Sequence, residues 1–266
     1  MRRLPQEVPQ GKREVVIVPG PHIKAANNAQ AGTSKTTVTA WDGPTRIFHW
    51  LLLTLIVCAW VSSEFAEALD DDLLVWHRWN GLAILVLIVW RILWGVFGSS
   101  TSRFMSFVPS PAGIWRHARQ TFQGTAPRYL GHNPLGSLMI IALLVFLSMQ
   151  ATLGLFAVDD NDLTGGPLHR LVSAADAKEA TRRHGWIFDF ILLPLAGLHI
   201  VTNVLYGRLK KEPLITAMIT GKKPADTYAD ESSAQLVAWP WTRALICLIA
   251  AISIVFGGLL LAGGRF

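Results

Sequence analysis

Four histidines, His49, His77, His184 and His199, carry the chemistry for which this sequence is equipped. Each lies in or at the end of a long apolar segment, where an ionisable side chain is costly and is by default a candidate functional residue. Imidazoles in such segments ligate a metal or a flat metal cofactor, relay protons, or form hydrogen bonds inside the fold. The depths of the four side chains, which follow from the segments that carry them, separate these possibilities.

Five apolar segments approach or reach the roughly 20 residues with which a helix spans a hydrocarbon layer. Only 16% of the residues are charged, and the residue alternation typical of a membrane β-barrel is missing. The sequence therefore predicts an all-α, multi-pass transmembrane helical bundle with a four-helix core and a fifth, C-terminal transmembrane helix. The expected spans are 46–63, 76–97, 135–158, 185–206 and 241–262.

Basic residues predict the orientation of the bundle. The two loops on the side of the N-terminus carry nine lysines and arginines, whereas the two opposite loops carry four; the nine are Arg103, Arg116, Arg119, Arg128, Arg208, Lys210, Lys211, Lys222 and Lys223, and the four are Arg170, Lys178, Arg182 and Arg183. The positive-inside rule then predicts a cytoplasmic N-terminus and a periplasmic C-terminus. The net charge of +6 is thus a topology signal that also favours contact with anionic lipid, and not a signal of nucleic-acid binding.

This topology places the histidines at two levels. His77 and His184 share the outer level, and His49 and His199 share the inner level. His184 and His199 lie 15 residues apart on one helix, which corresponds to a rise of roughly 22 Å and an angular offset of about 60°. Two imidazoles facing each other across two helices suit a planar porphyrin ligated from both sides, so the two pairs predict two haem groups stacked along the membrane normal.

Other residues near these pairs each have two possible interpretations, one as part of a cofactor site and one as an ordinary structural residue. Gly81, one turn from His77, leaves room for a flat ring or promotes close helix packing, as do Gly185 and Gly197. Arg46 and Arg91 fall at the inner level, where they pair with haem propionates or reach toward lipid headgroups. His132 precedes the third span; it either belongs to a helix start or forms a polar cluster that meets a quinone ring.

Several stretches resemble one family in order and spacing. They are residues 41–50 (WDGPTRIFHW), 90–95, 98–99 with 103–104, 131–136 and 217–222. Over residues 40–223 the chain is similar to bacterial di-haem cytochrome b561 proteins, including the b-type cytochrome subunits of nickel–iron hydrogenases. The resemblance implies two haem b groups on His49, His77, His184 and His199, and an electron-transfer subunit rather than a stand-alone enzyme.

The resemblance also implies a place and partners for the chain. The place is the bacterial inner membrane, and the electrons pass between the quinone pool and a periplasmic c-type cytochrome or dehydrogenase. We expect the subunit to be part of a hetero- or homo-oligomeric complex, with no residue that acts as a catalyst by itself.

Three regions are predicted: a largely irregular cytoplasmic tail (1–40), a four-helix di-haem domain (41–223), and a linker with the fifth helix (224–266). A short strand is expected at 14–18 and a short interfacial helix at 111–122. The alternative functions are a non-catalytic membrane anchor with structural histidines and a histidine-based proton or metal transporter; Asp189 is the one carboxylate expected in a span interior, which argues against the transporter. A metalloprotease is less consistent still, because the chain contains no HExxH motif.

Overall fold

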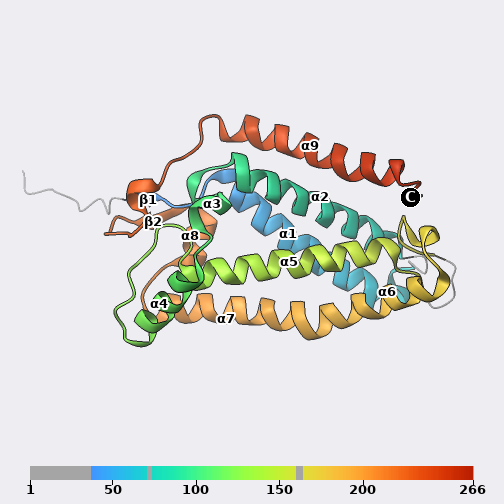
Figure 1. The fold of residues 1–266 in the computed structure, drawn as a ribbon, viewed down its shortest axis with the longest axis horizontal. Coiled ribbons are helices and arrows are strands. Elements are labelled where there is room, and N and C mark those ends of the chain that lie inside the picture. The colour runs from blue at the N-terminus through green and yellow to red at the C-terminus, as the bar shows by residue number, and fades with distance from the viewer. Residues whose placement is uncertain (1–36, 71–73, 160–163, 266) are drawn as a thin grey trace, which may run out of the picture. The chain divides into compact units, whose positions relative to one another are not determined.

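The computed structural model describes residues 37–70, 74–159 and 164–265. Five helical segments in these ranges are long and apolar enough to cross a membrane, and Figure 1 shows them running along a common direction. The predicted all-α bundle with a fifth C-terminal span is confirmed. The strand expected at 14–18 lies outside the described residues. The segments are α1 (Gly43–Glu64), α2 (Val75–Phe97), α5 (Pro134–Phe156), a continuous helix from Ala174 to Leu209, and α9 (Pro240–Leu261).

We call the end of the bundle at which α1 begins the proximal end, and the end at which α1 finishes the distal end. Polar caps determine two of the proximal helix starts. The Asp42 carboxylate accepts the Thr45 amide of α1 at 2.8 Å, and the Asn133 side chain accepts the Gly136 amide of α5 at 2.8 Å. A proline follows close behind each cap, where its missing N–H costs nothing.

The helix from Ala174 to Leu209 is longer than the predicted span. It consists of α6 (Ala174–Ile187), a π-helical turn η4 (Phe188–Leu192) and α7 (Leu193–Leu209). The first eleven residues of α6 are largely polar, so their hydropathy gave no sign of a span, although Ser173 caps a regular helix there. The π-turn is a second difference: the Leu193 amide donates to the Phe188 carbonyl, five residues back, just before Pro194.

Helix α2 is the centre of the packing. One face lies against α9, where Leu82, Val86 and Trp90 meet Cys247 and Ala251 in a shared buried cluster. The opposite face lies against α1, α5 and the π-turn through a second cluster that includes Ile84, Ile88, Leu147, Ile187 and Leu192. The Trp90 indole donates to the Ala244 carbonyl at 3.0 Å. The fifth helix is therefore fastened to the same element that carries His77.

Short elements and loops cover the proximal end. Strand β1 (Thr37–Thr39) pairs antiparallel with β2 (Lys222–Pro224), and the cover also contains η2 (Ser100–Ser102), α3 (Phe104–Phe107), α4 (Pro111–Phe122), α8 (Leu214–Thr220) and η5 (Glu231–Ser233). Helix α4 confirms the short helix expected at 111–122. Strand β1 was not expected, because its partner lies more than 180 residues away in the sequence.

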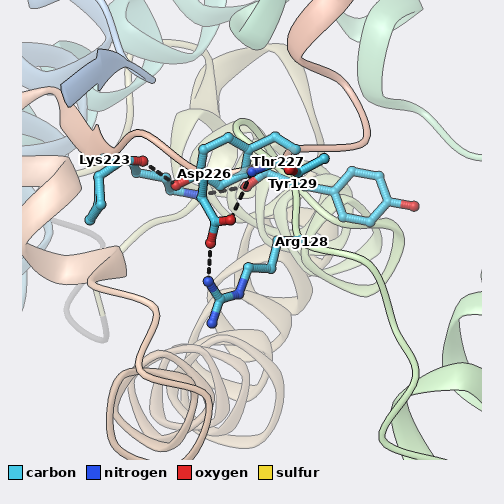
Figure 2. Close-up of polar contacts among 7 residues, drawn as sticks. Arg128, Tyr129, Lys223, Asp226 and Thr227 are labelled. Atoms are coloured by element: carbon cyan, nitrogen blue, oxygen red, sulfur yellow. Dashed lines mark hydrogen bonds and ion pairs between the residues drawn. The ribbon is translucent and has the colours of Figure 1, made fainter. Parts of the chain in front are cut away.

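Polar contacts join the segment between α4 and α5 to the segment that follows α8. Arg128 pairs with Asp226, whose carboxylate also accepts the Thr227 amide at 2.8 Å (Figure 2). The buried Lys223 ammonium donates to the Tyr129 carbonyl at 2.8 Å. Two further hydrogen bonds fix the residues just before His132. The Asp230 carboxylate accepts them from the amides of Leu130 and Gly131, at 2.6 and 2.8 Å.

Loops and the chain end meet at the distal end. The short helices η1 (Glu67–Leu69) and η3 (His169–Leu171) lie in its loops. The Thr181 hydroxyl of α6 bonds both the amide and the carbonyl of Val158, and the Arg265 amide donates to the Pro167 carbonyl at 3.0 Å. The position of α6 beyond the apolar layer is therefore braced by the preceding loop.

Candidate functional site

The four histidines meet in the two pairs that the sequence predicts. The ring centres of His77 and His184 lie 5.9 Å apart near the distal end, and those of His49 and His199 lie 6.5 Å apart toward the proximal end. Among the described residues, no three His, Cys, Asp or Glu side chains converge as a possible metal site. The geometry is that of two separate two-imidazole sites, which we call the distal and proximal sites.

Main-chain carbonyls orient both rings of the distal site. His77 Nδ1 donates to the Ala59 carbonyl at 2.8 Å, and His184 Nδ1 donates to the Gln150 carbonyl at 2.9 Å. Because a carbonyl oxygen only accepts, each Nδ1 carries the proton and each Nε2 keeps its lone pair. An imidazole held in this way is ready to ligate a metal through Nε2.

The proximal site lacks this arrangement. His49 Nδ1 is buried and has no hydrogen-bond partner among the described residues. Asn203, one turn after His199, places its amide nitrogen 3.4 Å from each ring nitrogen of His199 and donates to the His199 carbonyl at 2.6 Å. The ring planes are inclined by 45° here, against 81° in the distal site.

The spacing of both pairs fits a single metal between the rings. A bond between a metal and an imidazole nitrogen is about 2 Å long, so two imidazoles on opposite sides of one iron have ring centres about 6 Å apart. The observed 5.9 and 6.5 Å agree with that value. A Cβ atom added to Gly81, one helical turn after His77, would meet no atom within 4 Å, which leaves space on the face of α2 that carries that ligand candidate. A Cβ at the exposed Gly185 or Gly197 would also meet no atom within 4 Å. The donor sets and the spacing of the rings therefore fit a haem in each site.

The π-turn changes the angular relation between His184 and His199. In an unbroken α-helix the offset of 15 residues would be about 60°. The wider turn takes up one extra residue and sets the following helix back by about 100°, so the offset becomes about 40° in the opposite sense. His199 lies against His49 with this altered offset, so the π-turn contributes to the direction in which the His199 side chain points.

The structure places the two predicted arginines differently. Arg91 is 5% exposed, with its guanidinium 4.8 Å from the centre of the Phe104 ring. Its Nη1 is buried and has no hydrogen-bond partner among the described residues. Arg46 is half-buried at the proximal end, against the glycine Gly221 that ends α8, and its Nε is buried without a hydrogen-bond partner among the described residues. A buried cation without an anion beside it suits a carboxylate ligand, and Arg91 meets this description better than Arg46.

His132 is wedged between two aromatic rings of the proximal cover. Its ring centre lies 4.6 Å from that of Trp41 and 4.9 Å from that of Phe107. Its Nδ1 is buried and finds no partner among the described residues. Burial, and secondarily the charges of Arg91 and Lys223, lower the pKa of His132 to about 3. The side chain is therefore a neutral imidazole that retains an unused polar atom near the proximal site.

Two residues of α5 that contact His184 were not predicted from the sequence. Gln150, 9% exposed, supplies the carbonyl that holds His184, and its own side-chain Oε1 is buried and unpartnered within the described part of the chain. A Cβ atom on Gly154 would lie 3.1 Å from His184 Cε1, so glycine there allows the imidazole to approach α5. A glutamine inside an otherwise apolar span was a signal for the first; nothing in the sequence marked the second.

Comparisons with known proteins agree with this geometry. The family described as prokaryotic cytochrome b561 matches residues 40–221. The chain is 23% identical to a probable Ni/Fe-hydrogenase B-type cytochrome subunit of Rhizobium leguminosarum, over 76% of this chain and 95% of that protein. Proteins with the same name from Bradyrhizobium diazoefficiens and Azotobacter chroococcum are 22% and 26% identical, over 76% and 66% of this chain and 92% and 75% of theirs. No solved structure is significantly similar to the chain.

Proposed function

The chain belongs to the prokaryotic cytochrome b561 family, and from this premise we propose that it is a di-haem subunit that transfers electrons between a periplasmic redox partner and the quinone pool. Membership of the family implies membrane electron transfer and haem b. We infer in addition two haems per chain, their histidine ligands, a quinone site and a periplasmic partner. The observation that carries it is the meeting of four membrane histidines in two pairs, 5.9 and 6.5 Å between ring centres.

The ligand roles follow from the two sites. His77 and His184 hold one haem at the distal site, and His49 and His199 hold the second at the proximal site. A haem held by two imidazoles would supply one-electron transfer rather than oxygen chemistry. Gly81 leaves room beside the distal ring, and Arg91 offers its buried guanidinium to a propionate, with Arg46 nearer the surface.

The excess of basic residues favours a cytoplasmic proximal end and a periplasmic distal end, with the C-terminus, in a bacterial inner membrane. His132 offers a neutral imidazole with an unpaired Nδ1 to a quinone carbonyl. The partner at the distal end is a c-type cytochrome or a dehydrogenase, and the names of the relatives favour a dehydrogenase of the hydrogenase kind in a hetero-oligomeric complex.

The decisive measurement is the haem content of the purified, membrane-extracted full chain. A pyridine haemochrome assay with a reduced-minus-oxidised spectrum should give two b-type haems per chain. One haem should be lost in His77→Ala and one in His199→Ala. A chain without haem from a haem-sufficient host would refute the proposal and leave a membrane anchor or a histidine-based transporter as the function.

A further inference from the structure

Helix α4 presents an aromatic and basic face away from the bundle. It lies at the proximal end and packs against α5 (Figure 1). Trp115 is 76% exposed and Phe122 is 92% exposed, while Arg116 and Arg119 are also exposed. At 100° per residue, Trp115, Arg119 and Phe122 share one face, and Arg116 lies beside it.

The opposite face of α4 is committed to the bundle. His117 is 3% exposed and stands edge-on to the Tyr129 ring, with 5.5 Å between ring centres. Burial, and secondarily the nearby Lys210, lower the pKa of His117, so this inner face is uncharged at neutral pH. Because the inner face is packed, α4 cannot roll to bury Trp115 and Phe122, and the outer face must find its own environment.

The end of α7 continues the same surface. Leu209 is 77% exposed and lies between the exposed basic residues Arg208 and Lys211. The nearby Lys210 interacts with His117 of α4, so the two elements are neighbours. We call the combined surface the interfacial patch; it consists of Trp115, Arg116, Arg119, Phe122, Arg208, Leu209 and Lys211.

The level of the patch identifies its surroundings. The membrane span of α5 starts at Pro134, and α7 ends at Leu209, so α4 lies where the spanning helices leave the hydrocarbon. Exposed tryptophan and phenylalanine mixed with arginine are typical of a helix in the plane of that interface. Arg116 and Arg119 form no ion pair within the part of the chain that the structure describes, which leaves both guanidinium groups free to bind an external anion.

We propose that the interfacial patch binds anionic phospholipid in the leaflet at the proximal end. Trp115 and Phe122 insert below the headgroups, and Arg116 and Arg119 bind the phosphates, to which the planar guanidinium is suited. The exposed Leu205 and Val201 of α7 lie one and two turns before Leu209 on the same helix face, so an apolar surface of this span leads into the patch and favours lipid over a protein partner as its occupant. The proposal requires only that the bundle spans the membrane and is independent of the haem assignment.

The test measures which lipid lies against Trp115. The full chain is placed in nanodiscs that contain acyl-chain-brominated phosphatidylglycerol in phosphatidylcholine, or brominated phosphatidylcholine in phosphatidylglycerol. The fluorescence of wild type minus that of Trp115→Phe isolates one indole. Brominated phosphatidylglycerol should quench this difference signal more strongly, and Arg116→Gln with Arg119→Gln should reduce the preference by up to roughly fivefold per charge.

The control is Arg182→Gln with Arg183→Gln, which removes two exposed charges from the distal end and should leave the preference unchanged. High salt should lower the preference as the arginine substitutions do. A Trp115 signal that neither brominated lipid quenches would overturn the proposal and indicate a protein on this face. Equal quenching by both lipids, unaffected by the arginine substitutions, would overturn the binding of anionic lipid.

Discussion

His77 and His184 face each other from α2 and α6 with 5.9 Å between their ring centres, and each is held from behind by a main-chain carbonyl of a third element. The carbonyls of Ala59 on α1 and Gln150 on α5 thus fix the orientation of two imidazoles that come from two other helices. Four helices therefore contribute to this one pair. A hydrogen bond that orients the ring and leaves Nε2 unprotonated is typical of a histidine that ligates a metal.

Double substitutions test the pairing itself. If His77 and His184 share one haem, His77→Ala with His184→Ala should keep one haem per chain, because both changes remove the same site. His77→Ala with His199→Ala should keep none, because each change removes a different site. Haem per chain by pyridine haemochrome, with circular dichroism to verify the helices, distinguishes these results; the reverse pattern would contradict the pairing.

The open space beside Gly81 distinguishes a haem site from close helix packing. A leucine at Gly81 meets no protein atom near its Cβ, so the helices should tolerate it, yet its branches would occupy the room that a porphyrin needs. Gly81→Leu should therefore lose one of the two haems. Gly257→Leu on α9 is the matched control, since a Cβ there also meets nothing within 4 Å; it should retain both haems. Two haems in both variants would show that the space at Gly81 has another use.

Deleting one residue from the π-turn should have an effect on haem binding that a substitution in the turn does not have. Removing Phe190, which is 67% exposed, takes the extra residue out of the turn and rotates α7 relative to α6 by about 100°. His199 would then turn away from His49, while His77 and His184 stay in place. We expect the deletion to lose the proximal haem alone and Phe190→Ala to lose neither. Retention of both haems with an unshifted spectrum would show that the turn does not aim His199.

The membrane level of each histidine could be predicted from the sequence, because depth depends only on where a helix enters the membrane and in which direction it runs. Sequence reasoning missed the start of α6, because most of residues 174–184 are polar and hydropathy detects only apolar helices. It also missed the carbonyl of Gln150, the close approach at Gly154 and the pairing of Thr37–Thr39 with Lys222–Pro224. Each of these depends on contacts between distant segments, which no local pattern encodes.

His132 makes a prediction about pH. Its pKa is about 3 in the folded chain, against 6.5 for an ordinary histidine. Between these two pH values His132 binds a proton in the unfolded chain but not in the folded chain. The free energy of unfolding therefore decreases as the pH falls below 6.5. From about pH 7.5 to about pH 5 this one group should cost up to about 2 kcal/mol of unfolding free energy. The melting temperature of the detergent-solubilised chain should therefore fall more steeply with acid in wild type than in His132→Gln, since the two proteins differ only at this position. Equal slopes in the two proteins would mean that His132 is already solvated or protonated in the fold.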